Sequence, residues 1–143
     1  MTTRTYDPSR VNVTVGAATL SGFAADTFIS IEEVGDGVTS VVGADGEVAR
    51  AMSSDRRCRV KITLQQTSAG NDVLSALLQA DRLSGGGNLF PIAVADLRGR
   101  TVFTSSEAWV VKYPTAEFGA EVGSREWTIE TGNSAFFVGG NAA

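Results

Sequence analysis

The chain has 143 residues and a formal net charge of −4, with 43% hydrophobic residues, 20% charged residues and no histidine. This length suits one soluble domain that buries roughly 68% of its unfolded surface, and no apolar run approaches the roughly 20 residues that cross a bilayer. The lack of histidine excludes Ser–His and Cys–His catalysis, and a single cysteine, Cys58, excludes an intramolecular disulfide or a thiolate zinc site.

The N-terminal segment, residues 1–10, is predicted to be a flexible arm, because Pro8 disfavours regular structure. It contains no apolar stretch typical of a secretory signal, so we expect the chain to remain in the cytosol where it is made, unless a larger assembly carries it out. Val11, Val13 and Val15 then alternate with polar residues, which predicts a strand with one apolar face.

A meander of strands is predicted over 28–34, 38–42 and 47–52, with tight turns at Asp36-Gly37 and Asp45-Gly46. Asp-Gly pairs favour such turns because glycine readily adopts positive φ. The alternation over 57–65 predicts a further strand, with Arg57, Arg59 and Lys61 on one face and Cys58, Val60, Ile62 and Leu64 on the other. Cys58 is therefore predicted to be a buried thiol, with a disulfide between subunits as the alternative.

A helix is predicted over 69–83, with Ser68 or Asn71 as its N-terminal cap and Asp72 in its first turn. Glycines 85–87 end it. Its apolar stripe, which we expect to pack on the sheet, consists of Val73, Leu74, Leu77 and Leu78.

The remaining strands are predicted over 90–97, 101–113, 124–130 and 134–138. Turns at 98–100 and 132–133 and a loop over 116–123 join them, and residues 139–143 form a flexible tail. Residues 109–111 are apolar on both faces, which predicts coverage on both sides by the core or by a neighbour. Trp127 and Ile129 are expected to face inward. No linker divides the chain, so residues 1–143 are predicted to be a single domain.

The sequence shows no local motif for catalysis, metal binding or phosphate binding. Glu32 and Glu33 are adjacent on a predicted strand and therefore point to opposite faces. The Asp/Gly turns lack EF-hand spacing, and the glycine triplet lacks the context of a phosphate-binding loop. Folding could still bring two distant carboxylates together as the acid pair of a glycosidase, but no local feature of the sequence supports such a pair. We therefore expect no enzyme, no catalytic residue, no cofactor and no metal.

Six segments carry a resemblance when they are taken in order: YDPSRVNVTVG, GADGEVAR, RVKITLQQTSAGNDVLSALLQADR, DLRGRTVF, AWVVKYP and REWTIETGN. Together they resemble the tail tube proteins of contractile-tailed bacteriophages, and the resemblance covers nearly the whole chain. It implies a mainly β fold with one α-helix, a two-sheet β-barrel or sandwich that assembles as a ring. Tube proteins of type VI secretion systems share this fold.

The resemblance also implies a structural virion protein of the phage tail, made in the host cytoplasm. Its hexameric rings would stack into the inner tail tube through which DNA is ejected. The implied partners are further copies, the sheath protein, the tape-measure protein, and the baseplate and tail terminator proteins, with no membrane. Six copies of net charge −4 give about −24 per ring, and an acidic bore would let DNA pass without specific binding.

Candidate assembly residues follow from loops and exposed strand faces. We expect stacking contacts from residues 1–10, from Asp45, Gly46, Asp55 and Arg56, and from Glu117 and Phe118 in the 116–123 loop. We expect ring contacts from Arg57, Arg59, Lys61 and Trp109. Phosphate binding by these cations is a weaker alternative, because the chain is acidic and the cations can pair with carboxylates.

A second hypothesis is a small β-barrel that binds a sugar or peptide. In that case exposed aromatic residues such as Tyr6, Tyr113 and Trp127 would surround a groove.

Overall fold

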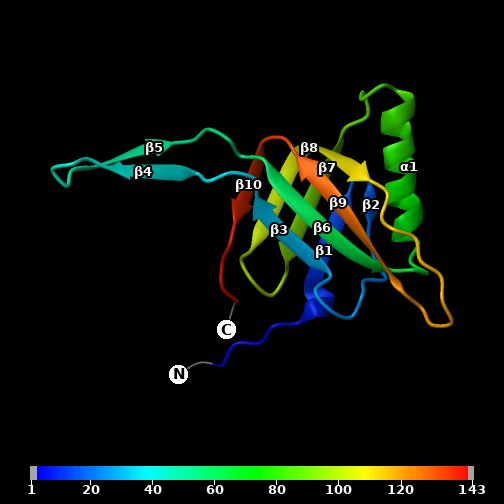
Figure 1. The fold of residues 1–143 in the computed structure, drawn as a ribbon. Helices are drawn as coiled ribbons and strands as arrows, with labels where there is room; N and C mark the ends of the chain where they lie inside the picture. The colour runs from blue at the N-terminus through cyan, green and yellow to red at the C-terminus, as the bar shows by residue number, and fades with distance from the viewer. Residues whose placement is uncertain (1–2, 142–143) are drawn as a thin grey trace.

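The computed structural model describes residues 3–141, which form a curled eight-stranded sheet, one α-helix and a separate two-stranded hairpin (Figure 1). The strand order in the sheet is β2-β1-β7-β8-β9-β6-β3, and β10 also pairs with β8. All pairings are antiparallel. The elements are η1 (Pro8–Arg10), β1 (Val11–Val15), β2 (Ala18–Thr19), β3 (Ile29–Glu33), β4 (Val38–Val42), β5 (Val48–Met52), β6 (Cys58–Gln65), α1 (Gly70–Leu83), β7 (Phe90–Asp96), β8 (Val102–Lys112), β9 (Ser124–Thr131) and β10 (Ser134–Phe137).

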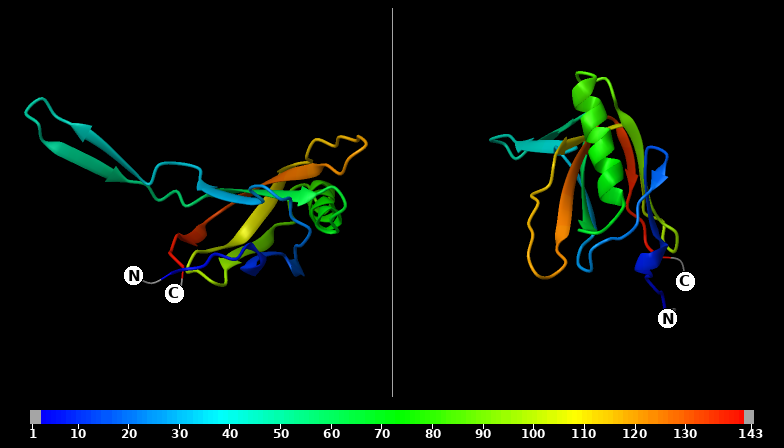
Figure 2. Two further views of the ribbon diagram at one scale, coloured as in Figure 1. Left: turned by 90° about the horizontal axis from the view of Figure 1, so that it is seen from below. Right: turned by 90° about the vertical axis from the view of Figure 1, so that its right-hand side faces the viewer.

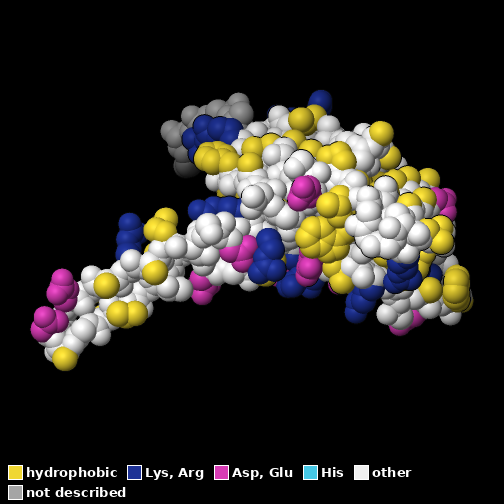
Figure 3. Space-filling model, turned by 90° about the horizontal axis from the view of Figure 1, so that it is seen from above, with side chains coloured by type: hydrophobic (Ala, Val, Ile, Leu, Met, Phe, Trp, Pro, Cys, Tyr) yellow, Lys and Arg dark blue, Asp and Glu magenta, His cyan; other side chains and the backbone are white. Residues whose placement is uncertain are grey.

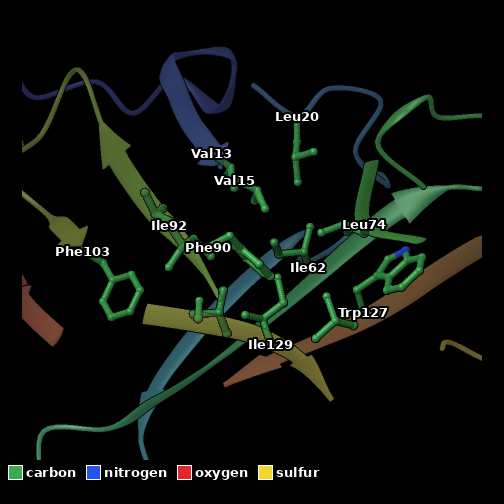
Figure 4. Close-up of a cluster of buried hydrophobic side chains, with 14 of the residues drawn as sticks. Val13, Val15, Leu20, Ile62, Leu74, Phe90, Ile92, Phe103, Trp127 and Ile129 are labelled. Atoms are coloured by element: carbon green, nitrogen blue, oxygen red, sulfur yellow. The ribbon is translucent and has the colours of Figure 1, made fainter. Parts of the chain in front are cut away.

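The core lies inside the curl of the sheet, where strands far apart in the strand order share one apolar cluster. Val13 of β1 and Ile92 of β7 lie in the same cluster as Ile62 of β6 and Ile129 of β9 (Figure 4). The two ends of the sheet thus act as the two layers of a sandwich. In residues 3–141 the terminal strands β2 and β3 do not pair with each other, so the barrel is not closed. The mainly β fold with one helix is confirmed.

The predicted strand faces of β1 and β6 are confirmed. Val13 and Val15 are buried, as are Cys58, Val60, Ile62 and Leu64. Cys58 is a free thiol with 1% of its surface exposed, and its Sγ lies 3.3 Å from the Ser134 hydroxyl. This burial argues against a disulfide between subunits.

The helix packs on the sheet through Leu74 and Leu78, which are buried. Ala69 takes the cap position and forms no side-chain hydrogen bond there, but the Ser68 hydroxyl accepts a hydrogen bond from the Gly70 amide, the first of the helix, at 3.1 Å. Of the two predicted caps, Ser68 is therefore confirmed and Asn71 is wrong. Asn71 instead accepts a hydrogen bond from Trp127 Nε1 at 2.9 Å and donates to the Gln65 carbonyl at 3.0 Å. Contacts with the sheet therefore fix the start of the helix. The chain leaves its other end through Gly85 and Gly86, both with positive φ.

The predicted hairpin of 38–42 with 47–52 is confirmed, because β4 pairs with β5. Two other predicted pairings of consecutive strands are wrong. β3 pairs with β6 and not with β4, because Ile29 and Ile31 of β3 pack against the core beside β6. Gly46 has the positive φ of 88° expected of a turn glycine, whereas Gly37 does not have positive φ. The predicted β9–β10 hairpin also fails, because β10 pairs with the first part of β8 and β9 with the last part.

The sequence showed no sign of β2, and it predicted that residues 109–111 of β8 are covered on both faces by the core or by a neighbour. Within one chain only one face of β8 is buried: Val110 is 4% exposed and Val111 is 42% exposed. Coverage of the second face by a neighbour stays a prediction.

The two ends of the described chain lie side by side (Figure 2). Asn141 forms a β-bridge with Gly99, and its side chain donates to the Thr5 carbonyl at 3.0 Å. Residues 8–10 form a short 3-10 helix instead of irregular chain. Residues 1, 2, 142 and 143 lie outside the described part, and the flexibility of residues 1–10 and 139–143 stays a prediction.

Candidate assembly surfaces

The projecting hairpin, residues 38–52, is formed by β4, β5 and the turn between them. Its two strands pair with each other and with no strand of the main sheet. It extends well away from the body of the molecule (Figures 1 and 2). Every residue of both strands is exposed. An isolated two-stranded hairpin is at best marginally stable in water, and within residues 3–141 no strand pairing joins this one to the main sheet.

Both faces of the projecting hairpin are largely apolar. The register places Val38 opposite Met52 and Val42 opposite Val48, so these four side chains share one face. Between 44% and 67% of each is exposed. The space-filling view shows apolar side chains along the hairpin and acidic ones at its tip (Figure 3). Exposed apolar patches of this kind mark interaction sites.

The predicted residues 45–46 and 55–57 lie at opposite ends of this hairpin. At the tip, Asp45 Oδ1 accepts a hydrogen bond from the Glu47 amide at 3.1 Å. At the base, both Asp55 carboxylate oxygens bind the Arg57 guanidinium at 3.0 Å. These hydrogen bonds, with one from the Arg57 amide, lower the pKa of Asp55 from its usual 3.8 to about 2. Arg56 donates to the Ser53 carbonyl at 2.7 Å. These base residues therefore hold the junction of the hairpin within their own chain.

Arg59, Lys61 and Trp109 lie on the outer face of the sheet formed by β3, β6, β9 and β8. Arg59 lies between Glu32 and Glu130, at 3.5 Å and 3.2 Å. Trp109 is the strand partner of Glu130 on the next strand. The predicted pairing of the cationic face with carboxylates is thus confirmed for Arg59, and for Arg57 at the hairpin base. Such pairing reduces the attraction of this face for phosphate.

Glu117 and Phe118 belong to a third region, the 116–123 loop. Arg125 donates to the Glu117 carbonyl at 2.9 Å, and its guanidinium lies 5.4 Å from the centre of the Phe118 ring. Phe118 nevertheless stays 82% exposed. The structure thus divides the predicted residues among the hairpin tip, the hairpin base, the outer sheet face and this loop.

The aromatic residues proposed for a ligand groove do not gather around one. Trp127 is 2% exposed and belongs to the core. Tyr113 packs beside it at 6.0 Å between ring centres, with the Arg82 guanidinium 5.1 Å from the Tyr113 ring centre. Tyr6 lines a separate groove at the other end of the sheet.

Among residues 3–141, no group of three or more acidic or cysteine side chains could hold a metal ion. No helix in the same range is long and apolar enough to span a membrane.

The apolar side chains of the projecting hairpin were not among the predicted assembly residues. The available signal was their pattern: residues 38–42 and 48–52 carry apolar residues on both faces and a single charge, Arg50. This composition is unusual for strands with a solvent-facing side.

Known proteins match this chain in sequence and in fold. The family model of the bacteriophage PhiTE tail tube protein matches residues 8–139. Structural protein ORF10 of Pseudomonas phage KPP10 is 35% identical over 147 residues, covering 97% of this chain and 84% of that protein.

Two similar solved structures belong to an extracellular contractile injection system, PVC, in its extended state. Its sheath/tube terminator has a TM-score of 0.66 at 12% identity, covering 96% of this chain and 100% of that chain. A chain of its sheath–tube complex has a TM-score of 0.63 at 10% identity, covering 93% of this chain and 91% of that chain. These structures share the fold, and the sequence match identifies the family. The chain belongs to the bacteriophage PhiTE tail tube protein family and is a structural protein of the phage virion, not an enzyme.

Proposed function

We propose that this protein forms hexameric rings that stack into the inner tube of a contractile tail, through which DNA is ejected. The observation that carries the proposal is the projecting hairpin, whose faces are apolar and exposed in a single chain. Burying a Val or Met side chain stabilises an assembly by roughly 1.5–3 kcal/mol. Contacts made by the hairpin alone would therefore contribute several kcal/mol per subunit.

The free strand edges support association in the same way. β2 and β3 end the sheet, so each has a side with unpaired backbone groups. A closed ring allows such edges to be paired or covered by the next subunit.

The outer face of the sheet supports passage of DNA without specific binding. Counterion release makes free cations the main source of affinity for nucleic acid. Arg59 is already bound to two carboxylates, and the whole chain is acidic. A bore in which cations are paired with carboxylates in this way would hold DNA weakly.

The proposed partners are further copies of the chain, a sheath protein and a tail terminator. The sheath–tube complex and the sheath/tube terminator among the similar structures support the last two. Tape-measure and baseplate proteins follow from the proposed place in the tail alone.

Negative-stain electron microscopy of the purified protein tests the proposal, with sedimentation to measure the polymerised fraction. We expect hollow rods from the wild-type chain and from Leu83→Gln, but not from Val42→Gln. Leu83 is a suitable control because it is 89% exposed on the helix, compared with 67% for Val42. A wild-type protein that stays monomeric at every concentration would refute the proposal.

A further inference from the structure

An apolar groove opens between β3 and β10 at the end of the sheet. Its volume is about 680 Å³. Its apolar lining comes from elements distant in sequence: Tyr6, Val11, Ile29, Ile31, Phe136 and Val138. Val138 is 71% exposed and Tyr6 is 56% exposed, so the groove is open to a partner.

We propose that this groove receives the projecting hairpin of a second copy of the chain. The inference rests on the proposed function, because it requires that copies associate, and it names the surface that the hairpin contacts. The hairpin of the same chain points away from the body of the molecule (Figure 1), so the occupant comes from another copy.

The apolar surfaces of the two elements match. One hairpin face presents Val38, Val42, Val48 and Met52, and the groove presents side chains of the same kind. Both β4 and the bordering strand β3 contain five residues, or about 17 Å of extended chain. One strand of the hairpin is therefore about as long as the strand that borders the groove.

The charges of the two elements are complementary. The groove lining contains Asp26 and Asp96 and no Lys or Arg, whereas β4 and β5 contain Arg50 and no Asp or Glu. The ion pairs within residues 3–141 join Arg57 and Arg59 to Asp55, Glu32 and Glu130. Arg50 and Asp26 take part in none of them, so both are available for an ion pair between copies. Arg50 also lies on the face that carries the four apolar residues, as the register shows. An apolar peptide without a cation would leave the carboxylates of the groove unpaired.

A cross-linking experiment tests the contact directly. One chain carries Val42→Cys, a second and size-tagged chain carries Val138→Cys, and the two are mixed under polymerising conditions and oxidised. We expect a disulfide-linked dimer that contains one chain of each kind. Leu83→Cys in place of Val138→Cys is the control and should give no such dimer, although Leu83 is 89% exposed. Cys58 is 1% exposed and can stay.

A charge exchange provides a second readout. Arg50→Glu should raise the critical concentration for polymerisation roughly tenfold, equivalent to about 1.4 kcal/mol. Adding Asp26→Arg should restore it to within roughly threefold of wild type. Asp36→Arg, another exposed aspartate outside the groove lining, should not restore it.

The outcomes separate the two proposals. If wild-type tubes form but neither the mixed dimer nor the rescue is observed, the groove is not the docking site and the tube function stands. If wild-type chains never polymerise, both proposals fall.

Discussion

The hydrogen bond between Asn71 and Trp127 is predicted to stabilise the docking of the helix on the sheet, and Asn71→Ala tests this. The indole Nε1–H is a donor only, and Trp127 is 2% exposed. Removal of the Asn71 side chain leaves this donor without its acceptor at 2.9 Å. It also removes the bond from Asn71 to the Gln65 carbonyl.

The expected loss of unfolding free energy is about 2–3 kcal/mol. An unsatisfied buried donor costs roughly 1–3 kcal/mol, and the more exposed bond to Gln65 contributes roughly 0.5–1 kcal/mol. This loss is a large part of the total unfolding free energy of a typical domain, which is roughly 5–15 kcal/mol. Asn71→Asp keeps an acceptor for the indole and places a negative charge in the first helical turn, so it should destabilise less than Asn71→Ala.

The measurement is urea unfolding followed by circular dichroism, at concentrations where the chain sediments as a monomer. A double-mutant cycle with Trp127→Phe isolates the bond, because phenylalanine has no N–H to satisfy. In that background Asn71→Ala should cost about 1–2 kcal/mol less than in wild type. Equal costs in the two backgrounds would show that the hydrogen bond does not stabilise the helix–sheet contact.

Three further predictions concern assembly, pH and packing. Arg59→Glu places a third carboxylate between two glutamates and should reduce tube yield while the circular dichroism spectrum stays native; an unchanged yield would contradict a role in ring contacts. Because the folded pKa of Asp55 is depressed, its bond to Arg57 adds stability above pH 3.8 that disappears as the pH falls to about 2. Unfolding of Asp55→Asn should therefore depend less on pH in this range. Leu74→Ala removes a side chain that is 0% exposed and should lower the unfolding free energy by about 2–5 kcal/mol in urea titrations; a loss under 1 kcal/mol would show that the helix contributes little to the core.

Local patterns were sufficient for most individual elements. The alternation over Cys58–Gln65 and Ser124–Thr131 predicted which side chains are buried, and the apolar stripe predicted the helix over Gly70–Leu83. These features depend on the geometry of one strand or one helix, so neighbouring residues specify them. Of the two predicted helix caps, Ser68 accepts from the Gly70 amide, whereas Asn71 does not cap the helix because it has a partner in Trp127, which is distant in sequence.

The candidate surfaces were predictable only in part. The sequence placed Asp45 and Gly46 at a turn and Arg59 on an outward face beside carboxylates, and the structure agrees. It did not reveal that the strands on either side of that turn leave the sheet, nor that a groove opens between β3 and β10.

The sequence by itself determined the strands, the helix and their buried faces, and through its family pattern it also indicated a tail tube protein. Only the tertiary structure decided which strands pair. Within residues 3–141, β3 pairs with β6, which is distant in sequence, whereas β4 and β5 pair only with each other and lie outside the sheet although the second edge of β3 is free. Strand pairing depends on competition among edges far apart in sequence, and that competition is settled by packing of the whole core.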